Sequence, residues 1–169
     1  PRSRGLGDVY KRQDFQVVAP TFDEVPIPGT PEEVVVARAL GKARSVAERT
    51  AERPVLGVDT EVVLDGEVLG QPTDAAEARA MLRRLAGREH RVLSGVAVIA
   101  DAERTGVEET RVRLIGLDDE RLDEEVARGE WRGRAGGYAI QESGGGLVAT
   151  IDGDFDNVVG LPVALALRL

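Results

Sequence analysis

The sequence predicts an α/β domain, and three observations support this. Short apolar stretches typical of strands alternate with segments of helical periodicity. Hydrophobic residues make up 42% of the 169 residues, enough for a core, and aromatic residues only 4%, so that core must be aliphatic. The length suits one domain. We assign this domain to residues 14–169 and interpret residues 1–13, which show no periodicity, as a non-native or disordered segment.

The first half of the chain predicts one helix and three strands. Thr30-Pro31-Glu32-Glu33 is typical of a helix start, with Thr30 as N-cap and Glu33 closing a capping box, and this helix should run to about Arg49. An Asp-Gly turn at 65–66 should join two strands as a hairpin. The strands are expected at residues 14–20, 55–64 and 67–70.

The second half continues the alternation. Helices are expected at 74–86 and 118–129, because each has a polar cap at its start and a glycine at its end. Two strands, at 90–100 and 110–117, should be joined by a polar loop, and a further strand should follow the glycine-rich segment 133–146. The residues after Gly160 should begin a last helix, which the chain cuts short.

Composition excludes several classes of function. A formal net charge of -8 opposes binding to a nucleic-acid backbone but not to a small phosphorylated ligand that arrives with a cation. The absence of Cys excludes disulfides and thiolate metal sites, and a single histidine, His90, excludes multi-histidine sites. No apolar run approaches the ~20 residues that cross a bilayer. We therefore expect a cytoplasmic protein without membrane contact.

Asp59 is the first candidate site residue. It lies in the strand 55–64 on the face opposite the apolar one, beside Gly57 and Glu61. A carboxylate close to a central strand needs a partner such as a metal ion or a lysine. The alternative is an edge strand with a solvated face.

Lys42 is the second candidate, because it interrupts an apolar helical stripe formed by Val35, Ala39 and Val46. It either snorkels, with its ammonium in water, or projects a cation toward phosphate. Gln141, in the glycine-rich segment, offers an amide to a base or a phosphate, and backbone N–H groups of that segment could bind an anion. We interpret His90 as structural, because no nucleophile lies near it in the sequence.

Together these residues resemble the Maf family of nucleotide pyrophosphatases. The resemblance covers about 14–169 and rests on VLGVDTEVVLDGEVLGQPTDAAEARAMLRRLAGREHRVLSGVAV, GRAGGYAIQ and GDFDNVVGLP. It implies an elongated mixed-sheet body with two lobes and a central cleft, similar to inosine triphosphate pyrophosphatases. The Asp-Thr pair and the Gly-Tyr-x-Ile-Gln motif are typical of the branch that prefers dTTP and UTP.

The resemblance also implies residue roles. Asp59 would be the catalytic carboxylate, Glu24 would join it in binding Mg²⁺ or Mn²⁺, and Lys42 would contact phosphate. Thr60 and Gln141 would help select the base, and Gln71 would contact substrate where the family usually has a lysine. The family suggests a homodimer.

The chain departs from the family in places. Nothing matches the opening strand and Ser-x-Ser-Pro-Arg-Arg loop, so the first strand and the end of the last helix are expected to be missing. Arg134 replaces a common lysine, and Glu142 a usual glycine. Three alternatives therefore stay open: a nucleotide-binding regulator of cell division without turnover, an inactive fragment of the enzyme, and a structural interaction domain.

Overall fold

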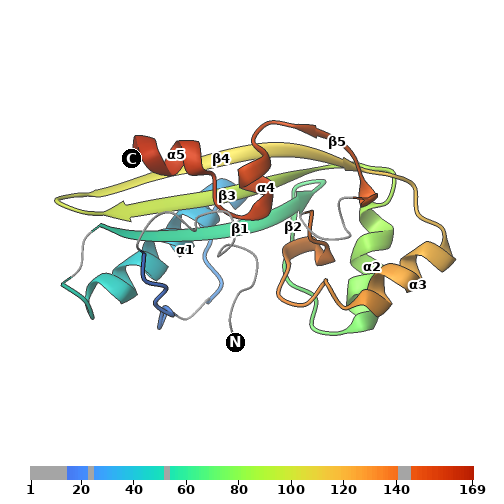
Figure 1. Cartoon of the computed structure of the whole chain (residues 1–169), viewed down its shortest axis with the longest axis horizontal. Helices are drawn as coiled ribbons and strands as arrows, with labels where there is room; N and C mark the ends of the chain where they lie inside the picture. The colour runs from blue at the N-terminus through green and yellow to red at the C-terminus, as the bar shows by residue number, and fades with distance from the viewer. Residues whose placement is uncertain (1–14, 23–24, 52–53, 141–145) are drawn as a thin grey trace.

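The computed structural model describes residues 15–22, 25–51, 54–140 and 146–169. A five-stranded sheet runs along the molecule, with strands in the order β2-β1-β3-β4-β5 (Figure 1). The strands are β1 (Val55–Leu64), β2 (Glu67–Leu69), β3 (Glu89–Ile99), β4 (Glu103–Leu114) and β5 (Val148–Asp152). The helices are α1 (Pro31–Ala47), α2 (Ala75–Leu85), α3 (Asp119–Arg128), η1 (Ala135–Gly137, a 3-10 turn), α4 (Phe155–Val159) and α5 (Val163–Arg168).

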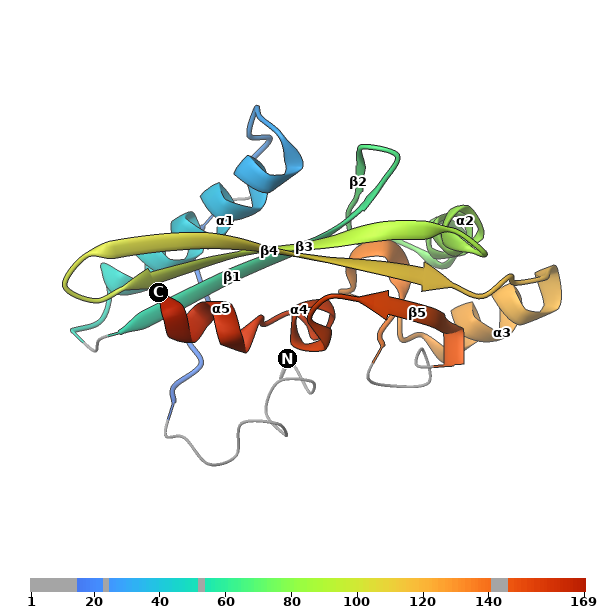
Figure 2. The same cartoon turned by 90° about the horizontal axis from the view of Figure 1, so that it is seen from above.

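The helices lie on both faces of the sheet. Helix α1 packs on β1 and β3, whereas α4 and α5 contact β3 and β4 from the opposite face (Figure 2). Helices α2 and α3 pack against each other at one end of the sheet, together with η1. None of the helices among the described residues has the length and apolar composition that a membrane crossing requires.

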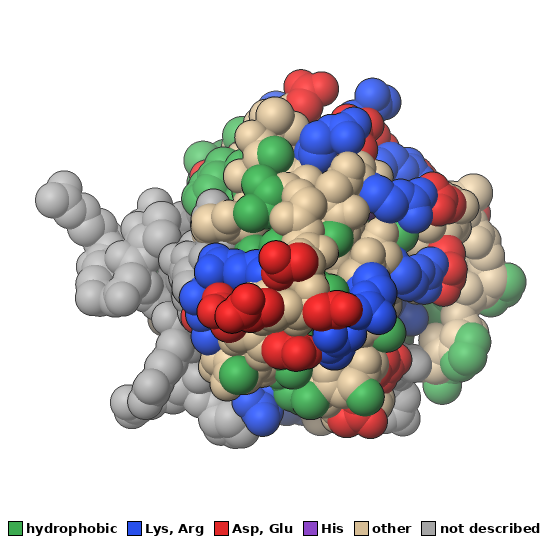
Figure 3. All heavy atoms as spheres, turned by 90° about the vertical axis from the view of Figure 1, so that its right-hand side faces the viewer, with side chains coloured by type: hydrophobic (Ala, Val, Ile, Leu, Met, Phe, Trp, Pro, Cys, Tyr) green, Lys and Arg blue, Asp and Glu red, His purple; other side chains and the backbone are tan. Residues whose placement is uncertain are grey.

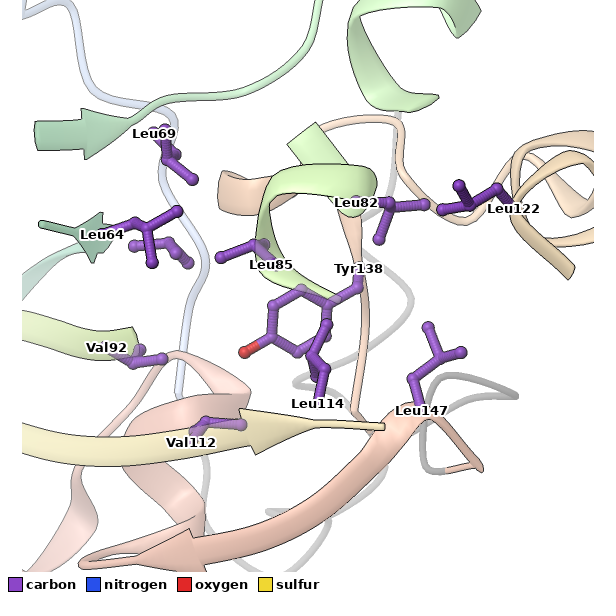
Figure 4. Close-up of a cluster of buried hydrophobic side chains, with 11 residues drawn as sticks. Leu64, Leu69, Leu82, Leu85, Val92, Val112, Leu114, Leu122, Tyr138 and Leu147 are labelled. Atoms are coloured by element: carbon purple, nitrogen blue, oxygen red, sulfur yellow. The ribbon is translucent and has the colours of Figure 1, made fainter. Parts of the chain in front are cut away.

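Three clusters of buried, mostly aliphatic side chains hold these layers together. The largest one lies where α2 and α3 meet the sheet, and the ring of Tyr138 packs among its leucines (Figure 4). Smaller clusters lie between α1 and the sheet, for example Val35 with Val63 and Leu93. The outer surface at the α2–α3 end is covered by acidic and basic side chains (Figure 3), and Arg79 there pairs with Asp123. The aliphatic core is as expected from the composition.

Most predicted elements are present because their local signals agree with their packing. Thr30 caps α1 with the full capping box, and Asp118 and Gly129 bound α3 as expected. Strand β1 has the predicted bounds. Asp65 (φ 54°) and Gly66 (φ 84°) both adopt the positive φ that a tight hairpin turn requires, and β2 follows.

Three predictions about strands are wrong. The sheet is not mixed, because every strand pair in the described part of the chain is antiparallel. Residues 15–22 form no strand. The side chain of Val17 is 78% exposed, so this apolar residue is not packed into the core. The expected polar loop before residue 110 is instead strand, since β4 begins at Glu103 and pairs with β3 along its length. Its polar side chains are mostly exposed.

Helix α4 was not predicted, although its signals are in the sequence. Asp154 caps its start, and Gly160 ends it with a φ of 111°. The helix has only five residues, too few for a periodic pattern to be recognised. It matters here because it brings the segment up to Gly160 against the sheet beside β1.

Candidate active site

Two ion pairs join α1 to the face of β1 that it covers. Lys42 Nζ lies 2.5 Å from Asp59 Oδ1, and Arg38 Nη1 lies 2.5 Å from Glu61 Oε1. Arg38 Nη1 is also 3.9 Å from Asp59 Oδ2. Asp59 and Glu61 are both buried, so neither carboxylate lies on the solvated face that was the alternative interpretation. Each charge is instead neutralised by a cation from the helix.

Two glycines let the helix come this close. A Cβ at Gly57 would lie 2.4 Å from the carbonyl oxygen of Ala39, and one at Gly95 would lie 2.2 Å from that of Val35. Gly95 is the partner of Asp59 across the β1–β3 pairing. The backbone of α1 therefore rests almost directly on the sheet beside Asp59, and the Lys42 side chain can reach its carboxylate.

The edge of β1 is open where these ion pairs lie. On its side away from β3, β1 pairs with β2 only at Val62–Leu64, and the described residues supply no other strand there. Side chains from both faces of the strand can therefore approach one space at this edge. Lys42 and Asp59 border it from the α1 side, and Thr60 from the opposite face.

That space is a pocket of about 230 Å³. Its floor is the apolar face of the sheet, including Val62 and Val92. One wall comes from the glycine-rich segment and the other from the end of α4. The wall residues are Gly133, Arg134, Ala135, Tyr138, Ala139 and Ile140 on one side and Val158, Val159 and Gly160 on the other. Aliphatic side chains on the floor and charged or polar side chains at the rim therefore line the same pocket.

Asp59 has one oxygen to spare for a ligand. Its Oδ2 is buried and has no hydrogen-bond partner among the described residues. A buried carboxylate oxygen without a partner fits either a divalent cation, which prefers oxygen ligands, or the proton of a bound water. No group of three or more His, Asp or Glu side chains in the described ranges could hold a metal ion by itself. A cation here would therefore need further oxygen ligands from outside these described residues.

His90 and Tyr138 form a buried polar pair behind the pocket. His90 Nε2 lies 2.7 Å from the Tyr138 hydroxyl, and the rings meet edge to face. Burial lowers the pKa of His90 to about 4 and raises the pKa of Tyr138, so both groups are neutral near pH 7. As predicted, His90 is structural: it anchors Tyr138, a wall of the pocket.

The structure brings four predicted site residues together. Lys42, Asp59, Thr60 and Gln71 all line the one pocket. Glu24 and Gln141 lie outside the described residues, as do residues 142–145 of the glycine-rich segment. Of that segment, the part up to Ile140 forms the pocket wall.

Sequence reasoning missed the second ion pair, although its spacing is visible. Arg38 lies four residues before Lys42 on the helix, and Glu61 lies two residues after Asp59 on the strand. Both spacings are roughly 6–7 Å and keep the side chains on one face. Two matched pairs, rather than one anomalous charge in each element, predict that this helix packs on this strand.

Fold and pocket together define an α/β protein with a ligand pocket whose rim carries a buried carboxylate and a lysine. A family model described as Maf-like protein matches residues 2–169. The chain therefore belongs to the Maf family.

Curated relatives agree with this assignment. A protein of Symbiobacterium thermophilum named dTTP/UTP pyrophosphatase is 48% identical over 151 residues, 88% of this chain and 78% of that protein. Proteins of the same name from Myxococcus xanthus and Dictyoglomus turgidum are 45% and 41% identical; they cover 92% and 89% of this chain, which in turn covers 80% of each.

Proposed function

We propose that this protein hydrolyses dTTP and UTP to the monophosphate and pyrophosphate. Its membership of the Maf family and the name that its relatives carry support the proposal. The observation that carries it is the Lys42–Asp59 pair at the rim of a pocket with an aliphatic floor. A carboxylate that can accept a proton, a positive charge near the phosphates and a pocket for the nucleobase are the parts that a nucleotide hydrolase requires.

The pocket suits the nucleobase of the substrate. Its volume of about 230 Å³ lies below the roughly 300–1,000 Å³ of drug-sized sites, so it would hold a base and little more. The aliphatic floor offers a flat apolar surface to a pyrimidine ring. The phosphates would then project over the rim, where Lys42 and Arg134 border the pocket.

The residues at the rim fit a divalent cation. We propose that Asp59, through the Oδ2 that accepts no hydrogen bond from the described residues, and Glu24 hold Mg²⁺ or Mn²⁺ together with the phosphates. The cation, when bound, neutralises phosphate charge in a protein whose own net charge is -8.

The chain's own groups would supply the rest of the chemistry. When Lys42 turns to the phosphates, Asp59 Oδ1 is released and accepts a proton from a water, whose oxygen attacks the α-phosphorus. The bond from the α-phosphorus to the bridging oxygen breaks, and pyrophosphate leaves with that oxygen. Lys42, which pairs with Asp59 in the protein without substrate, stabilises the negative charge that develops on the phosphates. Positioning and electrostatics carry most of such a reaction.

Further features follow from the family resemblance and stay proposals. The pocket would open into a cleft between two lobes, as in inosine triphosphate pyrophosphatases. The protein would act in the cytoplasm as a homodimer, without nucleic-acid or membrane partners. The strongly acidic charge supports the absence of nucleic acid.

The test is pyrophosphate release by the wild-type protein from dTTP, UTP, dCTP and dGTP with Mn²⁺ or Mg²⁺, with the nucleotide products identified by chromatography. The expected result is pyrophosphate and monophosphate in equal amounts from dTTP and UTP, and none after chelation of the metal. Chelation without nucleotide should leave Tm unchanged, because Lys42 already neutralises Asp59. Saturable dTTP binding without release would favour a regulator instead.

A further inference from the structure

A line of hydrogen-bonding groups leads from the pocket into the core. Thr60 on β1 and Ser94 on β3 are direct partners across the antiparallel pairing. Their hydroxyl oxygens lie 2.7 Å apart. Thr60 lines the pocket, whereas Ser94 is fully buried behind it. Ser94 therefore reaches a ligand only through Thr60.

The next member of the line fixes the direction of these bonds. Ser94 Oγ lies 3.4 Å from the backbone carbonyl oxygen of Asn157, which can only accept. Ser94 has one hydroxyl hydrogen. Both contacts are hydrogen bonds at the same time in one arrangement only: Ser94 donates to Asn157, and Thr60 donates to Ser94.

The Asn157 carbonyl is held firmly in place. The side-chain amide of Asn157 donates to the Val92 carbonyl at 3.0 Å and to Thr110 Oγ1 at 2.9 Å, and Asn157 is fully buried. The same carbonyl also accepts the backbone N–H of Gly160 at 3.0 Å. Buried networks in which the donors are assigned in this way resist reorientation.

Thr60 then faces the pocket with a defined polarity. Its hydrogen is used toward Ser94, so its oxygen presents only lone pairs to a ligand. Thymine and uracil carry a ring N3–H that donates to such an oxygen. Cytosine has an unprotonated N3 at that position, and two acceptors facing each other leave both without a partner.

We propose that Ser94 is a positioning residue for base selection: by taking the Thr60 hydrogen, it makes Thr60 an acceptor that favours thymine and uracil over cytosine. This rests on the proposed function. A site built to accept an N–H rejects a ligand that lacks it far better than an apolar pocket rejects a ligand of similar shape. The apolar floor cannot make that distinction, since the pyrimidine rings share their size.

The test compares kcat/KM for dTTP and dCTP in the wild type, in Ser94→Ala, in Thr60→Val and in the double variant. Ser94→Ala frees the Thr60 hydroxyl to turn its hydrogen toward cytosine. The dTTP/dCTP ratio should therefore fall about tenfold or more, mainly through a gain on dCTP. In the Thr60→Val background, Ser94→Ala should leave the ratio unchanged, which a merely structural role of Ser94 does not predict.

Two outcomes overturn the proposal: an unchanged ratio in Ser94→Ala, or the same fall with and without the Thr60 hydroxyl. Should Ser94→Ala lack a cooperative melt, Ser94→Cys replaces it, because the thiol sulfur is a weaker acceptor of the Thr60 hydrogen. A smaller fall in the same direction is expected there, and an unchanged ratio again contradicts the proposal. No turnover of dTTP by the wild type would instead reject the proposed function itself.

Discussion

Lys42 and Asp59 meet at 2.5 Å across the contact between α1 and β1, at the open edge of the sheet. The pair satisfies a buried carboxylate and at the same time places it beside a pocket. One Asp59 oxygen is held by the lysine, and the other accepts no hydrogen bond from the described residues, with Arg38 Nη1 3.9 Å away. The same contact therefore serves folding and the proposed chemistry.

Replacing Lys42 by Met should lower both the stability of the fold and the rate of the proposed reaction. Removing the ammonium leaves Asp59 buried without its closest partner, which costs about 1–3 kcal/mol in the free energy of unfolding. Pyrophosphate release from dTTP should fall by about 100-fold, because the charge that stabilises the phosphates is lost. Urea unfolding and the release assay measure the two effects.

Arg44→Met is the matched control, since Arg44 lies on the same helix and pairs with Glu103 of the sheet in an exposed position. It should change neither the urea midpoint nor the rate of release appreciably. Equal effects of the two substitutions would show that burial beside the pocket is irrelevant.

Gly95→Ala should destabilise the fold by about 1–3 kcal/mol, because the added methyl meets the backbone of α1 and no flexible side chain can yield. The loss should appear as a lower midpoint in urea. Gly116→Ala is the control: a Cβ there meets nothing within 4 Å, and its φ is not positive. A Gly95→Ala midpoint equal to that of Gly116→Ala would disprove the close approach.

Burial of His90 makes stability depend on pH. The pKa of His90 is lowered from 6.5 to about 4 in the folded protein, so between these values the unfolded chain binds a proton that the folded chain does not. Stability is therefore complete above pH 6.5 and falls as the pH drops toward 4. At pH 5 the loss should be about 2 kcal/mol, at 1.36 kcal/mol for each pKa unit.

His90→Gln removes this titrating group. The difference in unfolding free energy between the variant and the wild type, measured in urea at pH 7 and pH 5, isolates the His90 contribution from that of the carboxylates. A difference that is the same at both pH values would contradict the buried, neutral histidine.

Local signals were enough to predict much of this fold. The capping box at Thr30, the Asp-Gly turn and the cap residues of α3 each act within a few residues, so the sequence shows them directly. Pairing between segments that are distant in the sequence was harder to predict from local patterns. The first seven residues of β4 look like a polar loop because β3 and not their own composition makes them a strand. Residues 15–20, the described part of the first predicted strand, are not a strand, since apolar character alone forms no ladder.

The site was predictable to a similar degree. Asp59 stood out as a carboxylate in a predicted central strand and Lys42 as a charge in an apolar helical stripe, and they prove to be partners. Arg38 and Glu61 went unnoticed because each was considered by itself. Ser94 and Asn157 carry no signal in the sequence, because a serine in a strand and an asparagine near a turn are common. Only the three-dimensional structure shows that their hydrogen bonds lead to the pocket.

Pyrophosphate release by Asp59→Asn tests the central claim most directly. Asparagine keeps the shape of the side chain but cannot accept the proton of the attacking water, so kcat for dTTP should fall by about 1,000-fold or more while the protein still melts cooperatively. Glu103→Gln, which removes a strand carboxylate that pairs with Arg44 of α1 in an exposed position, should retain the wild-type rate. A folded Asp59→Asn protein that turns over dTTP within about tenfold of the wild type would contradict the role of Asp59.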